Sequence, residues 1–243
     1  MEQPPYIKEC DQIGDFAVWI VDGNYIRGAI DEQFTNFGHH REFNYIPKNE
    51  FWIDKESAEG ETKFFTEHLY IENQLMASGI ERKKARDIAN GIELEERKKD
   101  HSVQKNFKKL EEGKYQEVLE KIHKKKLKSY SEKIDVWIVD GALARSLFFM
   151  NFTAGGHSAV YDFIPENEVW IDDDISPKER KFILIHELYE RYLMKIKGWK
   201  SYDKAHAKAS LLEYFCRKHS KSTDLFLKEC LKLNQKFKEY EKI

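Results

Sequence analysis

In the second half of the chain, the spacing of hydrophobic residues changes from a strand pattern to a helical pattern. Short apolar runs at 136–141 (VWIVDG) and 169–171 (VWI) are typical of strands, and the first ends in Asp-Gly, a pair common in turns. From Ser176 to Gly198 the apolar residues recur at helical spacing, and a second helix is predicted from Ser201 past Glu213. The pattern therefore predicts a few strands followed by a helical hairpin.

The first half of the chain repeats this pattern. VWIVDG also stands at 18–23, and with that register held, the segment IPxNExWID occurs at both 46–54 and 164–172. The match continues through His68 with His186 and Glu72 with Glu190, and after a two-residue gap it pairs Glu93 with Glu213. A register held over this length predicts two homologous modules, at 15–95 and 134–219.

These features predict an α+β fold. Each module is expected to have a small, mainly antiparallel sheet, with two strands about a turn at 152–161, followed by the helical hairpin. Segment 96–133 is rich in Lys and Glu with apolar residues at three- and four-residue steps, which predicts a charged helical linker whose lysines 124–126 lie on a solvated face. Segment 220–243 predicts a helical tail that packs on the protein or mediates formation of a homo-oligomer.

Composition narrows the functional classes. The 243 residues carry 41 Lys plus Arg and 43 Asp plus Glu, for a net charge of -2, so bulk charge favours neither nucleic acid nor an anionic membrane as a partner. We find no apolar run of membrane-spanning length and no signal-peptide pattern. Cys10, Cys216 and Cys230 form no CxxC pair and are too few for a disulfide framework. These observations predict a cytoplasmic protein without a membrane partner.

A candidate metal site is found in the predicted hairpin. His186 and Glu190 are four residues apart, so they share one helical face and can bind a single cation. On the next helix His206 and Glu213 are seven residues apart and also share a face. In an antiparallel hairpin that turns at 198–201, His186 comes level with Glu213, and Glu190 with His206. We therefore predict that all four line one polar pocket, in which three could bind the metal and the fourth orient one of the three.

The segment 186–190 (HELYE) resembles the HExxH helix of zincin metallopeptidases, with Glu190 in place of the second histidine. A strand before the motif, and a Glu from a later helix as in the glutamate zincins, extend the resemblance. It implies that His186 and Glu190 bind zinc, that Glu187 is the general base, and that His206 or Glu213 is the third ligand. The implied activity is hydrolysis of an amide or ester by a metal-activated water, with peptide or protein as the expected substrate. Manganese or iron would also suit a His-carboxylate pair.

The first module departs from this pattern at two positions. It has Leu69 where the second has Glu187, and Arg86 where the second has His206. Loss of the base and a cation in the pocket should prevent metal-dependent hydrolysis there. Either the first module is a degenerate copy of an active second one, or the shared His and Glu residues are structural in both. In the latter case the protein is a non-catalytic tandem interaction or scaffold protein.

Other residues shared by the two modules have plainer interpretations. Asp22 and Asp140 precede glycine and are interpreted as turn residues. His39 and His157 follow glycine and are interpreted as loop histidines that cap strands, with a contribution to a ligand site as the alternative. Asp172, Asp173 and Asp174 are interpreted as a strand-end turn ahead of the helix rather than as catalytic groups.

Overall fold

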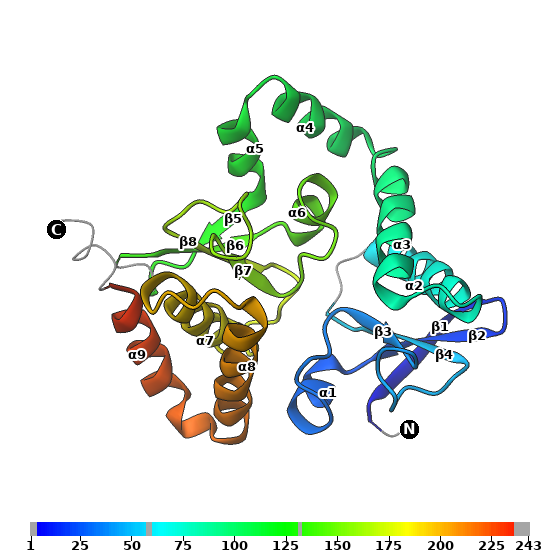
Figure 1. Cartoon of the computed structure of the whole chain (residues 1–243), viewed down its shortest axis with the longest axis horizontal. Coiled ribbons are helices and arrows are strands. Elements are labelled where there is room, and N and C mark those ends of the chain that lie inside the picture. Colours follow the sequence, from blue (N-terminus) through cyan, green and yellow to red (C-terminus); the bar gives the residue numbers. More distant parts are fainter. Residues whose placement is uncertain (1–3, 57–59, 131–132, 236–243) are drawn as a thin grey trace. The chain divides into compact units, whose positions relative to one another are not determined.

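The computed structural model describes residues 4–56, 60–130 and 133–235 (Figure 1). The chain forms two compact units. The N-terminal unit comprises Met1–Val118 with Ala142–Asn151, and the C-terminal unit comprises Leu119–Gly141 with Phe152–Ile243. No helix in the described ranges is long and apolar enough to cross a membrane.

Strands and helices alternate in the same order in both halves of the chain. The first half contains β1 (Tyr6–Ile13), β2 (Phe16–Val21), α1 (Gly23–Ala29), β3 (Phe37–His39), β4 (Glu50–Asp54), α2 (Glu61–Ala77), α3 (Arg82–Arg97), α4 (His101–Glu111) and α5 (Tyr115–Ile122). The second contains β5 (His123–Lys126), β6 (Asp135–Val139), α6 (Gly141–Leu147), β7 (Gly155–His157), β8 (Glu168–Asp172), α7 (Arg180–Arg191), a π-helical turn (Tyr192–Ile196), α8 (Tyr202–Lys218), a 3-10 turn (Ser220–Ser222) and α9 (Thr223–Gln235).

The two sheets have the same topology. Their strand orders are β1-β2-β4-β3 and β5-β6-β8-β7. In each sheet the central pair is parallel and the two outer pairs are antiparallel. The registers also correspond, since Trp19 lies beside Trp52 and Trp137 beside Trp170. The α+β class and the two-module layout are confirmed, and each sheet is mixed because one of its three strand pairs is parallel.

The core of the C-terminal unit lies between its sheet and helix α7. This helix packs against β7 and β8, and α8 and α9 pack against its other sides (Figure 1). The chain reverses at Gly198, which has φ 70°, and α8 begins after Ser201, whose side chain accepts a hydrogen bond from the Lys204 amide. The predicted hairpin is therefore present, with its turn at the expected place.

The prediction of two strands at 152–161 was wrong. Only β7 forms, because the chain turns immediately after it. The amides of Val160 and Tyr161 both donate to the His157 carbonyl at 3.0 Å. Those bonds close a turn where a second strand would have to begin.

The start of α7 and the linker also differ from the prediction. The amides of Glu179 and Arg180 donate to the Ser176 carbonyl, which forms a turn, and the α-helix begins only at Arg180. Within the segment predicted to be all helical, residues His123–Lys126 form edge strand β5. Its lysines therefore lie on an exposed strand, while the His123 ring stacks on Trp137 with 4.2 Å between ring centroids.

Two further expectations can be compared with the structure. Asp22 caps helix α1 by accepting the Tyr25 amide at 3.1 Å, so it begins a helix instead of a turn. The predicted tail is helical as far as Gln235, and α9 packs Leu227 and Cys230 into the core of the C-terminal unit. The rest of the predicted tail, 236–243, lies outside the described residues.

Candidate metal centre

The helical hairpin of the C-terminal unit brings the predicted residues together. His186, Glu187 and Glu190 lie on α7, and His206 and Glu213 lie on α8. Nδ1 of His186 is 2.9 Å from Glu213, and Nδ1 of His206 is 2.9 Å from Glu190. The level pairing predicted from helical periodicity is therefore present. His206 is the most exposed of the group, with a third of its side chain accessible, whereas the others are buried.

Three side chains meet in a triangle of ligand atoms. Nε2 of His186 is 3.1 Å from Nδ1 of His206 and 3.5 Å from Oε2 of Glu190, which is itself 2.9 Å from Nδ1 of His206. Zinc bonds to nitrogen and oxygen of about 2.1 Å imply edges of about 3.4 Å in a tetrahedral site. The donor types and their separations therefore fit a zinc ion bound by these three residues.

Glu213 has a different position in this arrangement. One of its oxygens faces Nδ1 of His186, the ring nitrogen that points away from the triangle. Its other oxygen accepts from Nε of Arg217 at 3.0 Å and from Nη2 at 2.8 Å, and Arg217 Nη1 donates to Glu179 at 2.6 Å. A carboxylate on Nδ1–H leaves the Nε2 lone pair free for a metal. The geometry thus favours Glu213 as the residue that orients His186.

His157 orients Glu190 from the sheet side. Its ring is fully buried in β7, and Nδ1 accepts a hydrogen bond from the Ala159 amide at 3.2 Å. The proton of the neutral ring is therefore on Nε2, which lies 3.2 Å from Oε1 of Glu190. The interpretation of His157 as a loop histidine was wrong, because the histidine lies in a strand. The repeated Gly-His pair of the two modules was the available signal for a shared role.

Hydrogen bonds and neighbouring charges shift the pKa values of the residues in this cluster. Burial opposes ionisation of Glu213, but the hydrogen bond to His186 and the positive charge of Arg217 outweigh it and lower its pKa to about 2. Burial likewise opposes protonation of His186, but hydrogen bonds to Glu190 and Glu213 raise its pKa to about 10. For Glu190, bonds to His157, His186 and His206 outweigh burial and hold the pKa below its ordinary value. The cluster is therefore built to hold positive charge between two carboxylates.

Glu187 has the opposite tendency. Burial raises its pKa well above that of an ordinary glutamate, and the negative charges of Glu190 and Glu213 add to the effect. One of its oxygens lies within 4.8 Å of a Glu190 oxygen and of a His157 ring nitrogen. A carboxylate beside a metal site with a raised proton affinity has the properties of a general base.

Two tyrosines border the cluster. The Tyr202 ring stacks on His206 with 5.3 Å between centroids, and its hydroxyl is 3.4 Å from Nδ1 of His206. Burial raises the pKa of Tyr161, and the charge of Glu187 adds to the shift. Both are neutral hydroxyl groups at ordinary pH, and neither was identified from the sequence.

The N-terminal unit holds the same supporting contacts around a different centre. Nδ1 of His68 is 2.9 Å from Glu93, Arg97 holds the other oxygen of Glu93 at 2.7 Å, and Arg97 also pairs with Glu61 at 2.6 Å. These contacts match those of His186, Glu213, Arg217 and Glu179. In place of a second imidazole, Arg86 donates from Nε to the buried Glu72 at 3.2 Å. A guanidinium cannot bind a metal, and it supplies the positive charge that Glu72 needs.

Another grouping of carboxylates lies at the end of β8. Asp172, Asp173 and Asp174 come within metal-binding distance of one another, but Asp173 is paired with Lys124 at 2.6 Å. Asp172 accepts the Asp174 amide at 3.1 Å, which closes a turn. The interpretation as a strand-end turn is confirmed.

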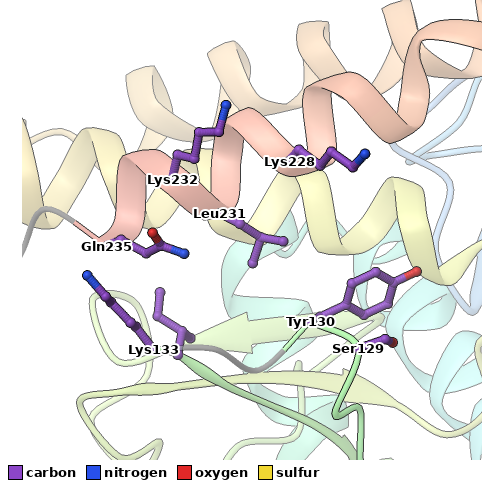
Figure 2. Close-up of a pocket in the computed structure, with 8 residues that line it drawn as sticks. Ser129, Tyr130, Lys133, Lys228, Leu231, Lys232 and Gln235 are labelled. Carbon is purple, nitrogen blue, oxygen red and sulfur yellow. The ribbon is translucent and has the colours of Figure 1, made fainter.

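A pocket of about 330 Å³ lies elsewhere in the C-terminal unit, between α9 and the segment before β6 (Figure 2). Its lining is Ser129, Tyr130, Lys133, Ile134, Lys228, Leu231, Lys232 and Gln235. Since this lining has no imidazole, carboxylate or thiol, it offers no set of metal ligands and does not contribute to the candidate centre.

The chain matches no protein-family model, no curated protein and no solved structure. The functional argument therefore depends on the geometry of this cluster.

Proposed function

We propose that the C-terminal unit is a zinc-dependent hydrolase that cleaves an amide or ester bond, with peptide bonds as the favoured substrate. The observation that carries the proposal is the triangle of His186, Glu190 and His206, with Glu187 beside it. Manganese or iron would also suit this mixture of imidazole and carboxylate. Zinc, when bound, would lower the pKa of a water molecule and polarise the substrate carbonyl.

The residues of the chain have distinct roles in this proposal. His186, Glu190 and His206 hold the metal, and Glu213 and His157 fix the orientation of His186 and Glu190. Glu187 takes a proton from the attacking water and returns it to the leaving group. No described residue donates a hydrogen bond to the Glu187 carboxylate, so the group is available for proton transfer.

The N-terminal unit is proposed to be a non-catalytic copy of the same module. Leu69 replaces the base and Arg86 replaces a ligand, while the supporting contacts and the strand order are retained. Common ancestry would explain why both units have the same carboxylate-imidazole contacts at corresponding positions.

Metal analysis and one conservative substitution test the proposal. Purified protein should hold close to one equivalent of zinc, which His186→Ala should remove. Glu187→Gln should keep the zinc and lower hydrolysis of a peptide or ester substrate by about 10²- to 10⁴-fold, the usual contribution of a general base. A protein that holds no divalent metal, and whose thermal stability ignores chelators, would contradict the proposal.

The alternative is a tandem interaction or scaffold protein without catalysis. It is favoured by the N-terminal unit, where the same His-Glu chain is closed by Arg86 and needs no metal. Chelator-insensitive stability would favour this alternative, because the C-terminal cluster would then also be structural.

A further inference from the structure

Strand β7 passes unusually close to helix α7 at Gly155. A Cβ atom on Gly155 would lie 3.1 Å from Cγ of Glu187, 3.1 Å from Ile183 and 2.8 Å from the Trp170 carbonyl oxygen. Contacts this short require a neighbour to move. The absence of a side chain at Gly155 therefore leaves the space that the Glu187 side chain needs.

The N-terminal unit fills the same position with an aromatic ring. Phe37 occupies the register position of Gly155, since it pairs with Ile53 as Gly155 pairs with Ile171. Its ring centroid is 4.5 Å from that of Phe65, and it packs in the same core cluster as the fully buried Leu69.

Two adjacent positions thus change together between the units. A glycine stands beside a glutamate in the C-terminal unit, and a phenylalanine packs with a leucine in the N-terminal unit. Replacing Leu69 by a glutamate in the N-terminal unit would place a carboxylate against the Phe37 ring, which cannot solvate it. The residue on the strand and the residue on the helix are therefore compatible with each other in each unit, and changing only one of them would be unfavourable.

The backbone before β7 is also specialised. Ala154 has φ 59°, and within the described ranges it is the one non-glycine residue with positive φ. The Gly155 amide donates to the Thr153 carbonyl at 2.6 Å, which closes a tight three-residue turn around Ala154. The corresponding Asn36 does not have this conformation. Strained backbone of this kind is concentrated at functional sites, where it is held by the surrounding structure.

We propose that Gly155 is a positioning residue for Glu187. The turn at Ala154 places Gly155 against α7, and because Gly155 has no side chain, the Glu187 carboxylate can lie beside Glu190 and His157. This inference rests on the proposed function, in which Glu187 is the general base. It adds that the Gly155-Glu187 pair, as well as the ligand set, separates the catalytic unit from its non-catalytic copy.

A double-mutant cycle of Gly155→Ala and Glu187→Ala tests the proposal. Thermal unfolding, zinc affinity and hydrolysis would be measured for both single variants and for the double variant. Gly155→Ala should keep zinc affinity within about threefold, because Glu187 is not a ligand, and should lower kcat by about a hundredfold with KM little changed. Its loss of Tm should be smaller when Glu187→Ala is also present. A single variant that fails to fold, with a double variant that folds, is the extreme form of this coupling.

Gly38→Ala, at the register position of Gly156 in the N-terminal unit, is the matched control. A Cβ there would meet the Phe43 ring at 2.6 Å, in the unit that does not contain Glu187, so its loss of Tm should be the same with and without Glu187→Ala. Equal losses of Tm from Gly155→Ala in both backgrounds would overturn the positioning proposal, as would an unchanged kcat. Absence of hydrolysis by the wild-type protein would instead contradict the proposed function, and the Tm cycle would still test whether Gly155 positions Glu187.

Discussion

The two units use one supporting network for two different centres. In each, a Glu-Arg-Glu-His chain runs from the start of one helix to the imidazole of the candidate site: Glu179, Arg217, Glu213 and His186 in one unit, and Glu61, Arg97, Glu93 and His68 in the other. The units differ in what meets that imidazole. One presents His206 and Glu187, and the other presents Arg86 and Leu69.

This difference separates structural from chemical roles. The Glu-Arg-Glu-His network that both units share holds an imidazole in place whether or not a metal could bind. Its role is therefore structural. The residues that differ are those that a metal-dependent reaction would need. Exchanging residues between the units is therefore the most direct way to test the comparison.

The largest expected effect follows from His206→Arg, which gives the C-terminal unit the residue of its counterpart. The variant removes one nitrogen from the ligand triangle and places a guanidinium beside Glu190, as Arg86 lies beside Glu72. Zinc affinity should fall by more than about a hundredfold, beyond the range seen when only an outer partner is removed. Isothermal titration would measure the change.

His219→Arg provides the control for that variant. His219 is exposed at the end of α8 and bonds only to backbone within its own turn. Its substitution should leave zinc affinity unchanged. If His206→Arg also left it unchanged, the ligand triangle would be wrong.

The next effect concerns the shared arginines. Arg97→Ala and Arg217→Ala should each destabilise their unit by about 3–5 kcal/mol, because each removes a buried positive charge that two buried carboxylates share. Only Arg217→Ala should also weaken zinc binding, by about 10- to 100-fold, since Glu213 would no longer be held against His186. Calorimetry and zinc titration would measure the two effects.

Lys98→Ala is a suitable control for the arginine variants, because Lys98 makes an exposed pair with Glu95 that should contribute little. Equal loss of zinc affinity in Arg97→Ala and Arg217→Ala would show that the two units do not divide function as the comparison requires.

The sequence predicted the parts of this site that depend on local helical geometry. The level pairing of His186 with Glu213 follows from helical rise and a hairpin turn near Gly198, and both are local properties. The same reasoning placed His206 opposite Glu190. The duplication also identified which residues to compare between the units.

The features that the sequence did not predict depend on contacts between distant segments. His157 reaches Glu190 only because β7 pairs with β8 and lies against α7, which no local pattern encodes. β5 was predicted as helix because it lies in a segment, 96–133, whose apolar residues recur at three- and four-residue steps, but its pairing with β6 decides its conformation. Asp22 was assigned to a turn because Asp-Gly is common in turns, although Asp is equally suited to cap a helix.

A smaller effect is expected when the exchange is made in the other direction. Arg86→His should place an imidazole beside Glu72, near Nε2 of His68, and so complete a ligand set in the N-terminal unit. The variant should bind a second equivalent of zinc, more weakly than the first because Leu69 and Phe37 leave the site less polar. Metal content per chain would be measured after dialysis against micromolar zinc.

Arg82→His is the matched control, because Arg82 pairs with Glu42 and not with Glu72. It should bind no second equivalent. The same stoichiometry in both variants would mean that the Arg86 position does not correspond to that of His206.

The smallest expected effect is a pH dependence of the stability of the N-terminal unit. Burial opposes protonation of His68, but hydrogen bonds to Glu72 and Glu93 raise its pKa above 6.5. Burial also opposes ionisation of Glu93, but the bond to His68 and the charge of Arg97 lower its pKa below 4.5. The stabilisation from His68 is therefore complete below pH 6.5 and is lost as pH rises through its raised pKa, whereas that from Glu93 is complete above pH 4.5 and is lost on acidification.

The N-terminal unit should therefore gain most from this pair between pH 4.5 and 6.5. Its unfolding transition in calorimetry is identified as the one that Arg97→Ala lowers. Above pH 6.5 its Tm should fall by a few degrees more in the wild type than in His68→Gln, which has no ionisable ring to lose a proton.

Parallel pH profiles for the two proteins would show that His68 and Glu93 do not form a charged pair. The polar cluster would then be held by neutral hydrogen bonds, and the positive charge between the carboxylates would come from Arg86 and Arg97 alone.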